Sequence, residues 1–208
     1  MRESSNDRRS TTALAACYRA LRSKGDAMSA VQFIKDSFAS IHGSYRDARE
    51  GQTVEQMHFV PEGESHSVAW ILFHTTRIED LMINGICQQK PHIFDEGNYA
   101  ERTGFPEQGF GTGQTTEEAR AVAITDLDAF TEYAEAVYAA TNAFLDGMSD
   151  DSDLEREVKL GERVETVSDN IRLHLLTHLN GHRGEVNLIR GMQGLPPVMA
   201  NARGQAPF

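Results

Sequence analysis

Apolar residues recur at intervals of three and four along this chain, and this periodicity limits the possible folds more than any other feature. Between residues 29 and 45 the apolar positions are Val31, Ile34, Phe38, Ile41 and Tyr45. Such spacing places an apolar stripe along one face of a helix. A helix of this kind must bury its stripe against a neighbour, so the pattern predicts helices packed on helices.

Four segments carry the helical pattern and together predict an all-α, four-helix bundle. Ser29 and Gln32 have capping-box spacing at the start of the first helix, as do Thr115 and Glu118 at the start of the third. Weak alternation over 154–167 predicts at most a short extended piece and no convincing strand. The predicted helices begin at residues 29, 67, 115 and 168 and end near residues 45, 85, 145 and 193.

The connection between the second and third helices, residues 87–115, is long for a compact domain. We call it the crossover segment. It has no period, and glycine and proline recur along it, with aromatic residues at Phe94, Tyr99, Phe105 and Phe110. Interspersed aromatics favour a packed lid or binding loop over disorder. Its glycine-rich run at 109–113 follows no strand and therefore does not indicate a phosphate site.

Charge and cysteine content narrow the classes of partner. The 208 residues carry a net charge of -11, which leaves no basic face for nucleic acid. No apolar run approaches the ~20 residues that span a bilayer, so a membrane is not expected as a partner. Cys17 and Cys87 lie in unrelated segments without a CxxC motif, which fits a reducing cytoplasm.

Two segments are expected to lie outside the core. Residues 1–27 are polar and rich in Ser and Arg, and Met28 directly precedes a good helix start. We therefore expect a poorly ordered extension over 1–27, with Met28 as a second possible start, and one domain over 28–208. The acidic cluster at Asp150, Asp151 and Asp153 is expected to be a solvated loop.

Histidines on two predicted helices form the main candidate site. His178 and His182 are four residues apart on the inward stripe of the fourth helix, so both imidazoles face one side. His74, on the stripe of the second helix, can add a third metal ligand across the bundle. Three protein ligands leave a coordination position open, as in catalytic zinc sites.

Spacing alone leaves alternatives open. Chance or hydrogen-bonded core histidines explain an isolated HxxxH equally well, although three buried imidazoles without a shared partner are destabilising by roughly a few kcal/mol. His174 precedes His178 by one turn and is either a fourth ligand or, as we expect, a supporting residue. The other histidines are expected to be solvated at helix ends or in loops: His42, His58, His66 and His92.

Carboxylates on the same helices are candidate catalytic residues. Glu79, Asp80 and Glu185 can orient an imidazole or accept a proton from metal-bound water. Ion pairs of Glu79 with Arg77 and of Glu185 with Arg183 are the alternative. Trp70 and Thr75 are expected to be packing residues. Gly181 and Gly184 are expected where a neighbouring helix or a substrate comes close to the site.

Two motifs together resemble the DinB-like (YfiT-type) family of metal-dependent four-helix bundles. Trp70, His74, Arg77 and Glu79 match the family's first motif. Its second motif, H-x-x-x-H-R-G followed by a Gly and Pro stop, matches residues 178–184, and Glu185 stands where the family more often has Gln. The resemblance extends from about residue 29 to residue 197.

The resemblance implies a divalent metal ion, zinc or nickel, held by His74, His178 and His182. It also implies a long crossover between helices two and three, a homodimer, and a small-molecule substrate. Family members of known activity include isomerases and transferases that use a low-molecular-weight thiol. We therefore expect a metalloenzyme that activates water or a thiol, as a transferase, isomerase or hydrolase.

Two other functions stay open at this point. One is a non-catalytic bundle that binds a metal or ligand in a stress response, which a fourth protein ligand such as His174 would favour. The other is the iron-binding bundle of ergothioneine-type sulfoxide synthases, which this chain resembles without their second domain.

Overall fold

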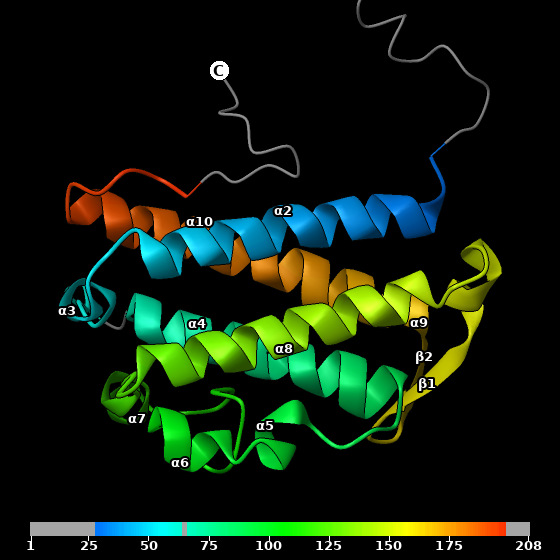
Figure 1. Cartoon of the computed structure of the whole chain (residues 1–208), viewed down its shortest axis with the longest axis horizontal. Helices are drawn as coiled ribbons and strands as arrows, with labels where there is room; N and C mark the ends of the chain where they lie inside the picture. The colour runs from blue at the N-terminus through cyan, green and yellow to red at the C-terminus, as the bar shows by residue number, and fades with distance from the viewer. Residues whose placement is uncertain (1–27, 64–65, 199–208) are drawn as a thin grey trace, which may run out of the picture.

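Within the described residues four long helices run side by side, as the computed structural model shows (Figure 1). They are α2 (Ala30–Glu50), α4 (Val68–Asp80), α8 (Leu127–Asp146) and α10 (His178–Met192). The structure describes residues 28–63 and 66–198. Helix α10 packs against α2 and α4, and α8 packs against the same two helices, which confirms the predicted all-α bundle. The expected extension over 1–27 and Cys17 lie outside the described residues.

Side-chain caps at the N-termini of α2 and α4 explain where these two helices begin. The Ser29 hydroxyl accepts a hydrogen bond from the backbone N–H of Gln32 at 3.1 Å, and Ser67 accepts one from Trp70 at 3.0 Å. Each cap satisfies an N–H group that the first helical turn leaves without a partner. The predicted stripes then meet in one core, whose largest fully buried side chains include Phe38, Tyr45, Phe73, Phe130 and Tyr133.

Two of the predicted helices contain π-helical segments. Helix α4 continues into the π-helix η1 (Leu81–Cys87), and the last predicted helix consists of α9 (Val167–Asn170), the π-helix η3 (Ile171–Thr177) and α10. A π-helix pairs residue i with i+5, and it is rare outside functional sites. The predicted extents of these two helices are therefore correct, but their geometry is not uniform.

The crossover segment is a packed loop with short helices, as expected. It contains α5 (Ile93–Glu96) and α6 (Tyr99–Thr103), and Phe94, Tyr99 and Phe105 are at most 4% exposed. A further short helix, α3 (Val54–Met57), lies in the connection between α2 and α4. The buried aromatics anchor the crossover segment to the bundle.

The predicted third helix is wrong as a single element. The structure divides it into α7 (Thr116–Ala121), with a complete Thr115–Glu118 capping box, and α8. Between them Thr125 bonds the carbonyl oxygen of Thr103 through both its N–H, at 3.0 Å, and its hydroxyl, at 2.9 Å. Asp126 then caps α8 by accepting from the N–H of Ala129. The hydrogen bonds of Thr125 therefore connect the segment between α7 and α8 to the crossover segment.

A two-stranded antiparallel hairpin corrects the expectation of no strand. Strand β1 (Glu157–Leu160) pairs with β2 (Arg163–Thr166), and Glu157 is opposite Thr166. The pattern was weak because each strand is only four residues long, and Val164 is 55% exposed. The hairpin lies beside α9, at one end of the bundle (Figure 1).

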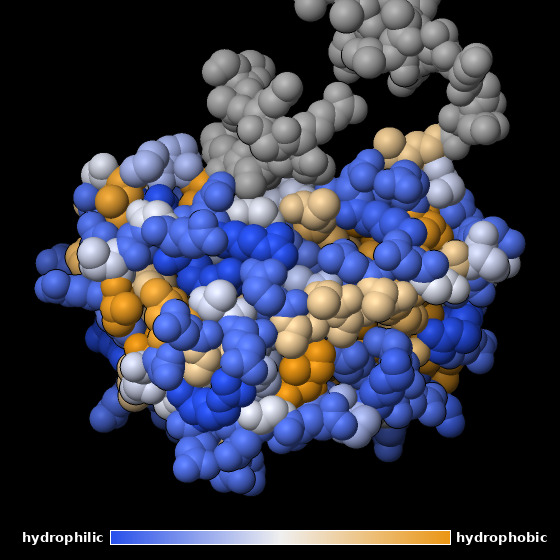
Figure 2. All heavy atoms as spheres, in the orientation of Figure 1, coloured by the Kyte–Doolittle hydropathy of each residue, from blue (hydrophilic) through white to orange (hydrophobic). Residues whose placement is uncertain are grey.

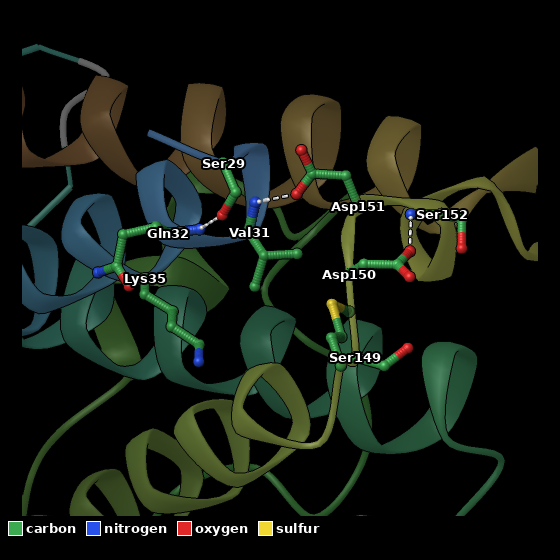
Figure 3. Close-up of a pocket in the computed structure, with 9 residues that line it drawn as sticks. Ser29, Val31, Gln32, Lys35, Ser149, Asp150, Asp151 and Ser152 are labelled. Atoms are coloured by element: carbon green, nitrogen blue, oxygen red, sulfur yellow. Dashed lines mark hydrogen bonds between the residues drawn. The ribbon is translucent and has the colours of Figure 1, made fainter. Parts of the chain in front are cut away.

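The acidic cluster is not simply a solvated loop. Asp151, in the 3₁₀ helix η2 (Asp151–Glu155), accepts hydrogen bonds from the N–H groups of Ala30 and Val31 at 2.9 and 3.0 Å. Figure 3 shows this carboxylate at the first turn of α2, on the edge of a surface hollow of about 560 Å³. The negative charge stabilises the positive end of the helix dipole.

The surface has no single large apolar area on the face in Figure 2, where hydrophobic areas are separated by hydrophilic ones. Large exposed apolar side chains occur on α2 and α10, including Phe33 at 59% and Leu188 at 66%. Within 28–63 and 66–198, no helix combines the length and hydropathy needed to cross a membrane.

A buried polar cluster joins three helices and corrects the expectation for His42. His42, expected to be solvated, is 1% exposed, and its Nε2 lies 2.9 Å from Glu79 Oε1. Thr141 donates to the same oxygen at 2.5 Å, and the imidazole stacks on Tyr138 at 3.9 Å. Glu79 therefore makes buried contacts that join α4 to α2 and α8.

We expect His42→Ala to lower the free energy of unfolding by about 3 kcal/mol, because it leaves the Glu79 carboxylate buried with only Thr141 as its hydrogen-bond partner. Chemical denaturation measures this loss. Metal binding should stay at the wild-type level, since the cluster lies away from His74, His178 and His182. A loss below 1 kcal/mol would show that the cluster is not a structural crosslink.

Candidate metal centre

The three predicted histidines lie together between α4 and α10. The Nε2 atoms of His74 and His178 are 3.1 Å apart, and those of His178 and His182 are 2.9 Å apart. All three ligand atoms are close enough to bind one ion. Because metal–imidazole bonds to zinc measure ~2.0–2.1 Å, one ion between these atoms can bond to each of them. His74 is 4% exposed, whereas the other two are half-buried.

Each imidazole uses its other nitrogen for a hydrogen bond. His74 Nδ1 donates to the carbonyl oxygen of Phe110, and His182 Nδ1 donates to Glu185 Oε2 at 2.9 Å. The His178 side chain donates to the backbone of His174. A neutral imidazole carries one N–H, so all three Nε2 atoms present lone pairs. The short Nε2–Nε2 distances therefore lack a proton to share and suit a shared cation.

Burial favours the neutral form of His74 and His178. It lowers the pKa of His74 from 6.5 to about 4, and it also lowers the pKa of His178. The charged form loses solvation when the ring is buried, which disfavours protonation. A neutral imidazole is the form that binds a metal, so burial favours the metal-binding form of His74 and His178 near neutral pH.

The π-helix η3 explains why His174 does not join the other three. In a continuous α-helix, residues 174, 178 and 182 would share a face. The wider turn of η3 ends immediately before His178, and His174 Nε2 instead lies 3.0 Å from Glu165 Oε2 on β2. The N–H of His178 bonds the carbonyl oxygen of Leu175, which leaves the carbonyl oxygen of His174 for the His178 ring.

Of the three candidate carboxylates, only Glu185 reaches the centre. The hydrogen bond from His182 lowers the pKa of Glu185, so the carboxylate stays charged and orients the ring. Glu79 bonds His42. Asp80 is fully buried and accepts from the backbone N–H groups of Ile93 and Phe94 at 3.1 and 3.0 Å. It anchors the crossover segment.

The alternative ion pairs of Glu79 with Arg77 and of Glu185 with Arg183 are not formed. Arg183 Nη1 lies 3.5 Å from the hydroxyl of Ser40, and Glu185 pairs with His182 instead. Arg77 Nη1 lies 4.0 Å from Asp80 Oδ2, and Glu79 pairs with His42.

The crossover segment covers His74, and sequence reasoning missed the residues that do so. Besides the Phe110 carbonyl, Gly111 lies against the ring with φ +89°, where an added Cβ would meet His74 Nδ1 at 2.9 Å. Only glycine suits both the conformation and the space. The sequence feature that could have indicated this contact is the glycine-rich run at 109–113, which we did not interpret as a site because no strand precedes it.

Trp70 and His66 extend the centre as a stack of rings. Trp70 stacks on His74 at 4.6 Å, and its Nε1 donates to Gln114 Oε1 at 2.8 Å. His66, expected to be solvated, stacks on the other side of Trp70 at 3.7 Å. Trp70 is thus more than a packing residue, because it holds the crossover segment beside the candidate metal ligand.

The two glycines of the last helix do not serve close helix packing. Gly181 and Gly184 are exposed, and a Cβ added at either would meet nothing within 4 Å among the described residues. The expectation of a neighbouring helix at these positions is wrong. Both glycines flank His182 in the sequence, and neither is covered by another described residue.

The pKa of His74 makes the stability of the metal-free protein depend on pH. Between pH 6.5 and 4 the unfolded chain binds a proton at His74 that the folded protein excludes, so unfolding becomes easier as the pH falls. From pH 7 to pH 4.5 this site should contribute about 2 kcal/mol of lost stability. Denaturation of the chelator-treated protein should show a smaller fall for His74→Gln. An equal fall in both would contradict the assignment.

Comparison with known proteins supports the fold. The chain is similar to the conserved protein of a locus from Enterococcus faecalis, with 20% identity, a TM-score of 0.67, and coverage of 81% of this chain and 99% of that chain. It is also similar to a DinB-like protein from Bacillus cereus, with 16% identity, a TM-score of 0.52, and coverage of 79% and 93%. No curated protein matches.

The sequence between residues 42 and 186 matches the DinB superfamily. This stretch contains the second, third and most of the fourth bundle helix, and it includes His74, His178 and His182. Since it spans more than half of the chain, the protein belongs to the DinB superfamily.

Proposed function

We propose that this protein is a metal-dependent enzyme in which His74, His178 and His182 hold one divalent ion, zinc or nickel. The convergence of three proton-free Nε2 atoms carries the proposal. Bound there, the ion supplies a Lewis acid that activates water or a low-molecular-weight thiol, or polarises a substrate carbonyl. The reaction is that of a transferase, isomerase or hydrolase.

The surroundings of the three histidines support an open site over a structural one. A structural zinc site has four protein ligands, whereas catalytic sites have three and an open position. His174, the obvious fourth ligand, is bonded to Glu165, and the described residues offer no other histidine, cysteine or carboxylate in the cluster. This arrangement favours catalysis over a non-catalytic metal-binding bundle.

Residues around the three histidines orient the ligands and control access to the ion. Glu185 orients His182, and the Phe110 carbonyl orients His74. Gly181 and Gly184 leave the approach to His182 free for a small-molecule substrate, and the crossover segment keeps water from the His74 side. We also propose a homodimer in the cytoplasm, and the exposed apolar side chains of α2 and α10 support self-association.

We expect His178→Ala to lose most of its bound metal, because it removes the ligand that lies between the other two. His174→Ala is the matched control on the same helix, and it should keep the wild-type stoichiometry. Elemental analysis of protein purified without an affinity tag measures both. Full metal content in the His178→Ala variant would overturn the proposed site.

The thiol version of the proposal has its own test. In protein loaded with cobalt, a low-molecular-weight thiol that reaches the open position should produce sulfur-to-cobalt charge-transfer absorption in the near ultraviolet. His178→Ala should not show this band. If no thiol of a panel changes the cobalt spectrum, activation of a thiol is wrong and the proposal reduces to activation of water or of a carbonyl.

A further inference from the structure

Arg77 is an unusual buried cation one turn after His74. Its side chain is 3% exposed, and Nε and Nη1 have no hydrogen-bond partner among the described residues. Nη2 reaches the carbonyl oxygen of Gly109 at 3.5 Å, and the guanidinium also interacts with the Tyr133 hydroxyl. Buried polar groups are nearly always paired, so such an arginine needs an explanation. A leucine or methionine would fill the same space without the loss of solvation.

Aromatic rings surround this guanidinium. Its central carbon lies 3.9 Å from the ring centre of Phe94 and 5.1 Å from that of Phe110. Both rings belong to the crossover segment, at points sixteen residues apart. A cation over an aromatic face is attracted by the ring quadrupole, and the attraction grows when both are desolvated. The planar guanidinium also stacks on ring faces, as an ammonium group does not.

Asp80 completes the arrangement on the same helix. Its carboxylate lies 4.0 Å from Arg77 and holds the backbone N–H groups of Ile93 and Phe94. The Arg77–Asp80 pair therefore touches the crossover segment at both Phe94 and Phe110. The contact with Phe110 connects Arg77 to the candidate metal centre, because the Phe110 carbonyl accepts the hydrogen bond from His74 Nδ1.

We propose that Arg77 is a positioning residue that holds Phe110 over His74 and thereby fixes the His74 imidazole with its lone pair on Nε2. The Arg77 guanidinium holds the ring of Phe110 in place, and this holds the backbone carbonyl of Phe110 in place as well. That carbonyl accepts the hydrogen bond from His74 Nδ1, which keeps the proton on Nδ1. The importance of this tautomer for metal binding rests on the function proposed above, whereas the coupling of Arg77 to His74 does not.

Arg77→Met tests the proposal, and Arg102→Met is its matched control. Arg102 also belongs to the crossover segment and lies over an aromatic ring, that of Tyr99, but it is bonded to Glu132 away from the centre. The first readout is the tautomer of His74 in metal-free protein at pH 8, from ¹⁵N NMR of the imidazole nitrogens, with His74→Gln to assign the signal. The second is the Kd for zinc.

In Arg77→Met we expect a mixture of Nδ1–H and Nε2–H tautomers and a 10- to 100-fold higher Kd, the usual effect of losing a group that orients a ligand. Arg102→Met should match the wild type in both. If Arg77→Met does not fold, Phe110→Ala replaces it, because it removes the stacked ring and should give the same changes.

A wild-type tautomer and Kd in Arg77→Met, or in Phe110→Ala where it is needed, would overturn the proposal. Equal changes in Arg102→Met would do the same, since they would show a general effect on the crossover segment. A wild-type protein that binds neither zinc nor nickel would contradict the metal function instead, and the tautomer comparison in metal-free protein would still decide the role of Arg77.

Discussion

The Nε2 lone pairs of His74, His178 and His182 point toward one another with no proton between them. The contacts of the surrounding residues keep the three rings in this arrangement. Each Nδ1 hydrogen is already donated, to Phe110, to Glu185 or to the backbone of His174. The Nε2 atoms of neighbouring rings are 2.9 and 3.1 Å apart, and lone pairs that face each other at such distances repel unless a cation lies between them. The bundle supplies the two facing helices, and the folded crossover segment holds the first ring in place.

Departures from regular helix geometry decide which groups reach the centre. The π-helix η3 turns His174 toward Glu165 and leaves its carbonyl oxygen available to His178. On α4, residues one turn apart have different partners: His74 faces α10, whereas Arg77 and Asp80 hold the crossover segment. Glu79 faces the core, where it joins α4 to α2 and α8. Residues 74–80 of α4 thus include the candidate metal ligand His74, the two residues that hold the crossover segment, and Glu79, which joins three helices in the core.

The features that could be predicted from sequence are those that depend on local spacing. Apolar periodicity predicts the four helices, and two histidines four apart on one stripe predict facing imidazoles. Features that depend on distant partners were not accessible. From the sequence alone His42 is predicted to be a solvated residue near a helix end, because its buried partner Glu79 is distant in the sequence. The helix break before Asp126 likewise depends on a contact between Thr125 and the distant Thr103. Apolar residues four apart, such as Ile171 and Leu175, fit an α-turn and a π-turn equally well, so periodicity did not reveal why His174 is excluded.

The most direct test of the account is a crystal structure of the protein grown with zinc, with anomalous diffraction collected on both sides of the zinc absorption edge. We expect one strong anomalous peak bonded at ~2.0–2.1 Å to Nε2 of His74, His178 and His182, with a fourth position filled by a non-protein ligand. The account would be contradicted by zinc bound elsewhere with none between these rings, or by His174 as a fourth protein ligand.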